Sequence, residues 1–258
     1  MTTASLGAAD YERALAERGH SEVTVVHRES TGSTNDDARA LTEDRLPALV
    51  IAETQTKGRG RGSNRWFSPE GCIAFTLTMA GVKGSSLGVL PLGVGACVAE
   101  ALRALGAPAR VKWPNDVLLD GLKACGILCE SSLLGGSARV FIGVGINVDA
   151  APGGLDAVGA SLADQGIAVH RPALVADITA RVLGLIRGGL PGPAVVGAWK
   201  SISAPWWGEE VTFVEGESER RVTLLDVNPE GQLVVRDQNG VVRSLLSGEV
   251  RRMRTARA

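Results

Sequence analysis

The sequence predicts an α+β protein in two parts, a larger domain of strands and helices over residues 1–204 and a small β domain over residues 205–258. Two observations support this. Strand-like stretches and helical patterns alternate through the first part, whereas short β-rich pieces separated by turns fill the second. The change of character falls at Ala204-Pro205, and we expect the domain boundary there because boundaries lie in connections between compact units.

The elements expected in the first part follow from the spacing of its apolar residues. Strands are predicted over residues 23–26, 49–53, 73–79, 111–113, 117–119, 122–131 and 141–148. Helices are predicted over residues 8–19, 36–41, 87–105, 173–186 and 195–200, with a short helix near Ser161 in the Gly-, Ala- and Pro-rich segment 152–170. Residues 81–86 are expected to form a turn, and Asp120-Gly121 a hairpin connection.

In the second part, strands are predicted over residues 210–214, 220–227, 232–236, 241–246 and 250–252. Turn residues separate them at Glu215-Gly216, at 228–231 and at Asn239-Gly240. Asn-Gly is a strong hairpin signal because both residues tolerate positive φ. Short strands at this spacing predict a small β-barrel or meander.

Composition and charge exclude several classes of protein. Of the 258 residues, 45% are hydrophobic, and the formal net charge of −1 argues against a general polyanion-binding surface. No apolar run approaches the roughly 20 residues needed to cross a bilayer. The first residues also lack a basic start followed by an apolar core. We therefore expect a cytoplasmic protein without a membrane segment.

The cysteines and histidines do not indicate a metal or redox centre. The four cysteines lie in apolar stretches without metal-type spacing and are expected to be reduced and buried: Cys72, Cys97, Cys125 and Cys129. The three histidines, His20, His27 and His170, are scattered along the chain. Neither a zinc enzyme nor a His-dependent triad is therefore expected.

The segment from Glu53 to Gly71 has the clearest functional composition. It interleaves glycines with arginines and then reaches two aromatic residues: Gly58, Arg59, Gly60, Arg61, Gly62, Arg65, Trp66 and Phe67. Glycine leaves the backbone thin and free in φ, while guanidinium groups suit carboxylate or phosphate oxygens. This composition indicates an anion-binding loop, with a solvated connector or a nucleic-acid-binding segment as an equal alternative.

A run of hydroxyl residues and an asparagine, Ser30 to Asn35, precedes the predicted helix 36–41. Such residues commonly cap a helix N-terminus, and on local grounds we favour this interpretation. The alternative is that Ser33, Thr34 and Asn35 present small donors and acceptors to a polar ligand at the end of a strand.

Further motifs follow in order along the chain. They are Lys112-Trp113-Pro114-Asn115-Asp116, then Lys123 with Gly126-Ile127-Leu128 and Glu130, and finally Gly143-Val144-Gly145-Ile146-Asn147. Together with Ser33-Thr34-Asn35 and Gly58-Arg59-Gly60-Arg61, they resemble the motifs of biotin protein ligases, also named biotin–acetyl-CoA-carboxylase ligases. The resemblance covers residues 23–252.

This resemblance implies a mixed-sheet catalytic domain related to class II aminoacyl-tRNA synthetases and biotin/lipoate ligases, followed by an SH3-like β-barrel. It implies an enzyme that joins biotin to ATP, giving biotinyl-5′-AMP and pyrophosphate, and then transfers biotin to a lysine of a biotin carboxyl carrier protein or domain of an acyl-CoA carboxylase. Some relatives carry an N-terminal winged helix-turn-helix. Only residues 1–22 precede the first predicted strand here, so no sequence-specific DNA binding is expected. The sequence leaves the oligomeric state open.

At the biotin side, the resemblance assigns Ser33, Thr34, Asn35 and Gln55 to the ureido ring of biotin. This makes chemical sense because a ureido group has two N–H donors and one carbonyl acceptor, which hydroxyl and amide groups can satisfy. The resemblance reverses the preference for a plain helix cap.

At the phosphate side, Arg59 and Arg61, flanked by Gly58 and Gly60, match arginines that contact the biotin carboxylate and the adenylate phosphate. Bringing two anions together requires positioned cations. Trp66 is expected to pack across the closed site, with ordinary core packing as the alternative.

Lys123 matches a lysine expected to contact the biotin carboxylate and the α-phosphate, whereas a strand lysine usually extends to solvent. Asp116 is expected either to help hold Mg²⁺ with the phosphates or to accept the proton of the carrier lysine. Its structural alternative is an Asx turn beside Pro114.

Asn115 and Asn147 are the candidates for contacts with the nucleotide. Gly126, Gly143 and Gly145 are expected to provide backbone clearance.

One position departs from the family pattern. Many relatives have a basic residue two places before the loop tryptophan, where this chain has Asn64. Two rival functions remain. A lipoate ligase or octanoyltransferase would share the fold, although the Ser-Thr-Asn turn suits a ureido ring better than a dithiolane or alkyl chain. A nucleic-acid-binding protein is disfavoured by the near-neutral charge and the 4% aromatic content.

Overall fold

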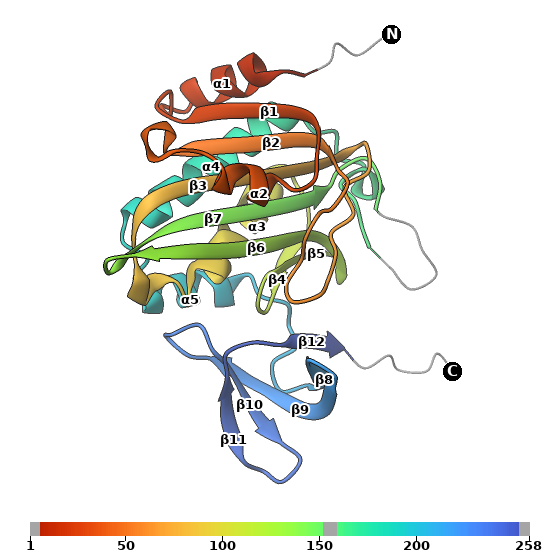
Figure 1. Cartoon of the computed structure of the whole chain (residues 1–258). Helices are drawn as coiled ribbons and strands as arrows, with labels where there is room; N and C mark the ends of the chain where they lie inside the picture. Colours follow the sequence, from red (N-terminus) through yellow and green to blue (C-terminus); the bar gives the residue numbers. More distant parts are fainter. Residues whose placement is uncertain (1–5, 152–158, 253–258) are drawn as a thin grey trace.

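A computed structural model of the chain describes residues 6–151 and 159–252. These residues form two sheets, one of seven strands and one of five (Figure 1). The seven-stranded sheet has the order β1-β2-β3-β7-β6-β5-β4. Its pair β1/β2 is parallel and its other neighbours are antiparallel, so the sheet is mixed. The predicted α+β fold class is confirmed.

The strands of this sheet are β1 (Thr24–Thr31), β2 (Ala48–Gln55), β3 (Cys72–Lys83), β4 (Ala109–Lys112), β5 (Asp116–Leu119), β6 (Leu122–Leu134) and β7 (Ser137–Asn147). The helices are α1 (Ala8–Ala16), α2 (Thr34–Arg39), α3 (Leu90–Ala104), α4 (Arg171–Arg187) and α5 (Gly192–Ser201). Figure 1 shows α2 on one face of the sheet and α3 and α4 on the opposite face.

Apart from the short helix expected near Ser161, each predicted strand and helix of this part is present with ends within five residues of the prediction; β7, for example, begins four residues early, at Ser137. The turn predicted over residues 81–86 is wrong in its first half, because β3 continues to Lys83 after a bulge and pairs there with the start of β7. Strand β1 extends five residues beyond Val26, to Thr31, because its polar half pairs with β2 up to Gln55. The short helix expected near Ser161 is a 3-10 turn over Ala163–Gln165. Residues 152–158 of that segment lie outside the described residues.

The main core lies between the sheet and the helices behind it. Helix α3 is apolar on nearly every side and is buried along most of its length. Its Gly93 lets α4 approach closely, since a Cβ there would lie 2.6 Å from Leu185. The opposite face of the sheet carries a smaller cluster under α2: Val26, Ala38, Val50 and Phe141. Less apolar covering on that face leaves room for polar side chains.

The five-stranded sheet comprises β8 (Glu210–Glu215), β9 (Ser218–Val227), β10 (Leu233–Asp237), β11 (Val242–Leu245) and β12 (Glu249–Arg252), in the order β11-β10-β9-β8-β12. The predicted boundary at Ala204-Pro205 lies in the connection between α5 and β8.

The turn after β9 packs against the larger part of the chain. A Cβ at Gly192 of α5 would lie 2.4 Å from the Pro229 carbonyl oxygen, and Trp113 Nε1 donates to the Gly231 carbonyl oxygen at 3.0 Å. Trp113 also lies near Phe213 of β8, with ring centroids 6.3 Å apart. The small sheet is thus held directly against the Lys112–Asp116 turn.

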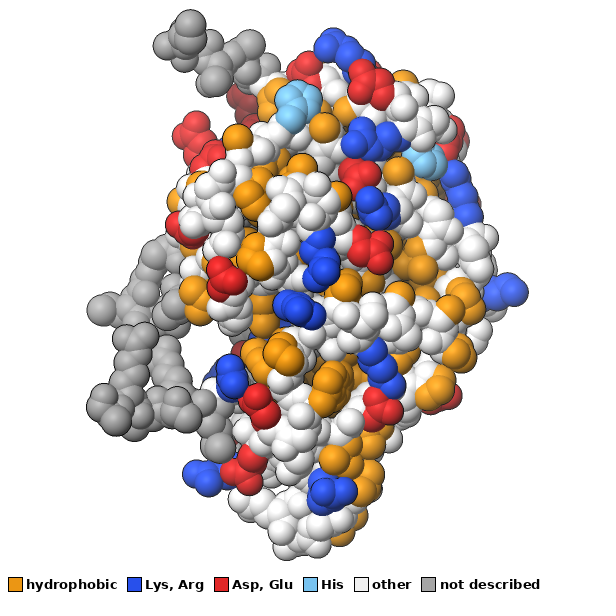
Figure 2. Space-filling view, turned by 180° about the vertical axis from the view of Figure 1, so that it is seen from behind, with side chains coloured by type: hydrophobic (Ala, Val, Ile, Leu, Met, Phe, Trp, Pro, Cys, Tyr) orange, Lys and Arg blue, Asp and Glu red, His pale blue; other side chains and the backbone are white. Residues whose placement is uncertain are grey.

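Figure 2 shows acidic and basic side chains mixed over the back of the molecule, in line with the near-zero net charge. Among the described residues, no helix is long and apolar enough to cross a membrane.

Candidate functional site

The candidate site lies on the face of the seven-stranded sheet that carries α2. Residues 56–71, which we name the arginine loop, fold back on themselves over this face (Figure 1). Bridges join Gln55 to Ser68 and Arg59 to Arg65, and the Trp66 N–H donates to the Gly58 carbonyl oxygen at 3.0 Å. Gly58 is required here because a Cβ would lie 2.3 Å from the Trp66 carbonyl oxygen. The loop is therefore an irregular hairpin.

The indole of Trp66 rests on a pair of glycines. Gly126 of β6 and Gly145 of β7 are cross-strand partners, and Asp116 of β5 pairs with Gly126 on its other side. A Cβ at Gly145 would lie 2.3 Å from indole atoms, and one at Gly126 would lie 2.9 Å away. The indole Nε1–H is buried and has no hydrogen-bond partner among the described residues. The two glycines therefore provide clearance for this ring.

A chain of uncharged polar groups lies beside the indole. Gly143 is two residues from Gly145 on the same face of β7, and Asn35 of α2 covers it, since a Cβ there would lie 2.5 Å from Asn35 Oδ1. Thr76 of β3 donates to this Oδ1 at 2.6 Å. The Thr34 N–H donates to Gln55 Oε1 at 2.9 Å. The predicted Thr34, Asn35 and Gln55 thus come together.

Ser33, also predicted for this side, occupies the N-cap position of α2, and its side chain is buried but makes no capping hydrogen bond. Gln55 Nε2 donates to Ser68 Oγ at 3.3 Å, which links the strand end to the arginine loop.

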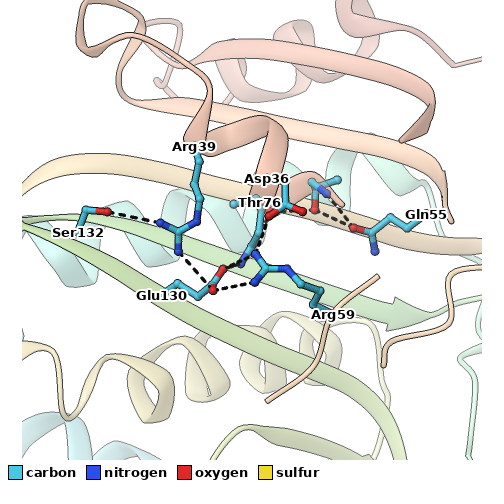
Figure 3. A network of polar contacts seen from close by, with 9 residues as sticks. Asp36, Arg39, Gln55, Arg59, Thr76, Glu130 and Ser132 are labelled. Carbon is cyan, nitrogen blue, oxygen red and sulfur yellow. Dashed lines mark hydrogen bonds and ion pairs between the residues drawn. The ribbon is translucent and has the colours of Figure 1, made fainter. Parts of the chain in front are cut away.

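Glu130 of β6 joins this polar group to the arginines (Figure 3). Asn35 Nδ2 donates to Glu130 Oε2 at 2.8 Å, and Arg59 donates to both carboxylate oxygens at 3.0 and 2.8 Å. Arg59 also reaches Asp36 at 2.8 Å, and Arg39 lies 3.3 Å from Glu130. Burial opposes ionisation of Glu130, but the hydrogen bonds from Asn35 and Arg59 outweigh it and lower its pKa.

At the other end of the indole, Asp116 holds two lysines. Its Oδ2 lies 2.7 Å from Lys112 Nζ and its Oδ1 lies 2.7 Å from Lys123 Nζ. Lys123 Nζ also lies 5.8 Å from the centroid of the Trp66 ring. Burial of Asp116 raises its pKa, but the charges of Lys112 and Lys123 outweigh this and the net pKa is lowered.

Arg61 reaches across to the small sheet. Its Nη1 donates to the Gly248 carbonyl oxygen at 3.1 Å, and burial lowers the pKa of its guanidinium while the nearby Asp116 and Glu249 carboxylates oppose that shift. Gly248 has φ 137° and its missing Cβ would lie 2.1 Å from the Phe213 ring, so only glycine fits.

The two asparagines predicted for the nucleotide side differ in their bonding. Asn115 Nδ2 donates to the Ile127 carbonyl oxygen at 2.7 Å, which fixes the turn before Asp116 to β6. Asn147 Nδ2 donates to the Ala160 carbonyl oxygen at 3.0 Å, whereas its Oδ1 is buried and unpaired among the described residues. Buried acceptors are usually paired, so this unpaired Oδ1 distinguishes Asn147 from Asn115, and a contact of either residue with the nucleotide stays a prediction.

The predicted contact of Asp116 with Mg²⁺ does not fit the resting geometry. Both carboxylate oxygens are engaged by ammonium groups, and the described residues contain no cluster of three His, Cys, Asp or Glu side chains suited to a metal ion. Magnesium prefers several oxygen ligands, which a carboxylate engaged by two ammonium groups does not supply.

Sequence reasoning left three residues out of the site. Lys112 and Glu130 stood in the quoted motifs without a role, and Thr76 carried no signal. Their functions depend on partners, since Glu130 meets Asn35 and Arg59 only through the fold. Asn64, the departure from the family pattern, is exposed, and its backbone closes the tip of the arginine loop by accepting from the Gly60 N–H at 2.8 Å.

Known proteins resemble this chain in sequence and in fold. Residues 24–147 match the sequence model of the Biotin/lipoate A/B protein ligase family. The chain is 43% identical over 129 residues to the biotin--[acetyl-CoA-carboxylase] ligase of Paracoccus denitrificans, covering 47% of this chain and 53% of that protein. It is 38% identical over 148 residues to the protein of the same name from Mycobacterium tuberculosis, covering 54% of each. In both cases, the match spans little more than half of the relative's own length.

Solved structures extend the similarity over more of the chain. A mutant biotin protein ligase from Aquifex aeolicus in complex with biotin has a TM-score of 0.74 and 26% identity, covering 89% of this chain and 99% of that one. A biotin protein ligase from Leishmania major in complex with biotinyl-5-AMP has a TM-score of 0.64 and 26% identity, covering 86% of this chain and 98% of that one. In sequence over residues 24–147, and in fold over most of the chain, this protein is therefore similar to members of the biotin/lipoate A/B protein ligase family.

Proposed function

We propose that this protein is an ATP-dependent biotin ligase, a biotin–[biotin carboxyl-carrier protein] ligase. It would activate biotin to biotinyl-5′-AMP and transfer the biotinyl group to a lysine of a carrier protein or domain of an acyl-CoA carboxylase. The proposal is supported by relatives described as biotin ligases and by similar structures in complex with biotin or biotinyl-5-AMP.

The observation that carries the proposal is the arrangement of polar groups along one face of the sheet. Uncharged hydroxyl and amide groups lie near Gly143, the lysine pair lies beside Gly126, and the Trp66 indole lies between them. A ligand with a neutral, hydrogen-bonding head and an anionic tail matches this order. Biotin has a ureido head and a carboxylate tail, and ATP supplies a second anion at the same end.

In the first step, a biotin carboxylate oxygen would attack the α-phosphorus of ATP, forming the C–O–P anhydride as the bond to pyrophosphate breaks. Both reactants are anions, so cations must hold them together. We assign this role to Lys123 and Arg61. Arg61 uses one N–H for Gly248 and keeps four for a phosphate.

The nucleotide would lie toward Asn147, whose unpaired Oδ1 suits an amino group of the base. Magnesium would arrive with the ATP phosphates, because the described side chains provide no ready metal site.

In the second step, the neutral amine of the carrier lysine would attack the biotinyl carbonyl carbon, and AMP would leave as the amide forms. The amine must first lose a proton, since the pKa of a free lysine is about 10.4. The lowered pKa of Asp116 makes its carboxylate a weak base. We therefore favour a role for Asp116 in positioning Lys112 and Lys123 over a role as the proton acceptor.

A cytoplasmic location is part of the proposal. All four cysteines are free thiols in the structure, as expected for a reducing compartment.

The proposal is tested by biotin-dependent exchange of pyrophosphate into ATP and by avidin detection of a biotinylated carrier fragment. Lys123→Ala should lower the exchange rate by about 100-fold or more, because it removes a positioned cation from the reacting oxygens. Circular dichroism should show that the variant is folded. Absence of exchange and of biotinylated product from the unmodified protein would refute the proposal. Calorimetric titration with biotin and with lipoate separates it from the lipoate ligase alternative, since tighter binding of lipoate would favour the latter.

A further inference from the structure

We infer that Glu130 is a positioning residue that fixes Asn35 and Arg59 relative to each other, and that it thereby sets the affinity for biotin. The inference rests on the proposed function for its ligand, but its geometry stands on its own. Glu130 is four residues after Gly126 on β6, so the two residues lie on the same face of the sheet.

A single carboxylate connects Asn35 of α2 to Arg59 of the arginine loop (Figure 3). Its Oε2 accepts from Asn35 Nδ2 and from Arg59 Nη2, both at 2.8 Å, while Oε1 accepts from Arg59 Nη1 at 3.0 Å. The contact with Arg59 is therefore bidentate, the geometry that orients a guanidinium plane most strongly.

The orientation of Asn35 is determined at both of its polar atoms. Glu130 takes the amide nitrogen at 2.8 Å, and the Thr76 hydroxyl donates to the amide oxygen at 2.6 Å. A carboxylate without a proton can only accept, so the amide cannot flip without placing its oxygen against Glu130. The lowered pKa of Glu130 keeps it in this acceptor form.

Arg59 keeps donors for a ligand in this arrangement. Glu130 and Asp36 together use three of its five N–H groups. The charges in the cluster also balance, because Arg39 and Arg59 face Glu130 and Asp36. Arg59 thus keeps two N–H groups for a ligand while Glu130 holds the guanidinium group in place.

Glu130→Gln preserves the shape of the side chain and removes its charge, and one oxygen is replaced by an NH₂ group that faces other donors. We expect the KM for biotin in pyrophosphate exchange to rise about tenfold or more, as expected for loss of a charge-assisted contact. The KM for ATP should stay within about twofold, since the phosphate contacts proposed above belong to Lys123 and Arg61, whereas the partners of Glu130 are Asn35, Arg39 and Arg59. Glu130→Asp keeps the charge on a shorter side chain, so its KM for biotin should lie between those of the unmodified protein and of Glu130→Gln.

The matched control is Glu219→Gln, the same substitution at an ion pair with Arg251 in the small sheet, 3.3 Å apart. It should leave both KM values unchanged. A purely structural role for Glu130 would change both KM values together with the melting temperature, or none of them. Either result would overturn the inference.

A second measurement does not depend on activity. Crystal structures of the unmodified protein and of Glu130→Gln should show Asn35 and Arg59 displaced in the variant. Unchanged positions of both side chains would overturn the inference. If the unmodified protein shows no biotin-dependent exchange, the proposed function fails, and the crystal structures still decide whether Glu130 positions the two residues.

Discussion

Asp116→Asn is expected to destabilise the folded protein because Asp116 neutralises two ammonium groups at once. Its carboxylate is buried, and each oxygen lies 2.7 Å from a lysine Nζ. The amide has nearly the same volume but carries no charge. The substitution therefore leaves Lys112 and Lys123 facing each other without a counter-ion.

The expected decrease in the free energy of unfolding depends on how well each lysine side chain can be solvated. Removing one partner of a buried ion pair costs about 3–5 kcal/mol. The Lys112 side chain is only 13% exposed and cannot easily be resolvated, whereas that of Lys123 is 43% exposed and can turn outward. We therefore expect the lower end of this range, about 3 kcal/mol, in the free energy of unfolding.

Urea denaturation followed by circular dichroism measures this quantity, with Glu219→Gln as an exposed ion-pair control expected to lose less than about 1 kcal/mol. The folded-state pKa of Asp116 is lowered, so its contribution is fully present above the unfolded-state pKa of about 3.9 and is lost as the pH falls through the folded-state value. The difference from the unmodified protein should accordingly be constant from about pH 5 to pH 8 and shrink only in stronger acid. A loss below about 1 kcal/mol at pH 7 would refute the reasoning.

Two further predictions concern the packing around the site. Gly145→Ala places a Cβ 2.3 Å from the Trp66 indole, so the ring must move. We therefore expect the rate of pyrophosphate exchange to fall about tenfold or more. The control is Gly197→Ala, where a Cβ would meet nothing within 4 Å, and this variant should leave the exchange rate unchanged. Equal activity of the two variants would contradict the placement of Trp66. Burial raises the pKa of the Cys97 and Cys129 thiols to about 12, and also raises those of Cys72 and Cys125. Cys72, Cys97 and Cys125 are buried, whereas Cys129, which was also expected to be buried, is partly exposed. In Ellman's assay at pH 8, we therefore expect three of the four thiols to react at least about 100-fold more slowly in the native protein than in guanidinium chloride, and rapid native labelling of more than one thiol would contradict this burial.

Local patterns in the sequence were sufficient to predict those helices and strands in which the spacing of apolar residues matches the buried face. Helix α3 and the β5–β6 hairpin are examples, since the first is buried along most of its length and the second has a two-residue connection. The polar half of β1 was missed because His27 to Thr31 has no strand-like alternation of apolar residues; pairing with β2 decides its conformation.

Contacts between distant parts of the chain also explain why some residues of the site were not predicted. The motifs identified Asn35 and Arg59 as candidates, but gave no role to their shared partner Glu130, which follows them by 95 and 71 residues and meets them only through the fold. Lys112 was missed for another reason. Its carboxylate partner lies only four residues away, but the sequence does not show that the turn folds Lys112 back onto Asp116 and that Asp116 is buried.

The contact between Arg61 and Gly248 joins residues separated by 187 positions in the chain. During synthesis, the arginine loop leaves the ribosome long before the β11–β12 connection has been synthesised, so Arg61 cannot yet form its hydrogen bond to Gly248. The seven-stranded sheet and the helices that cover it can form first, because all of these elements end by Ser201. A nascent chain stalled after α5 has left the ribosome and before Gly248 is synthesised should therefore contain a folded sheet whose Arg61 is still unanchored.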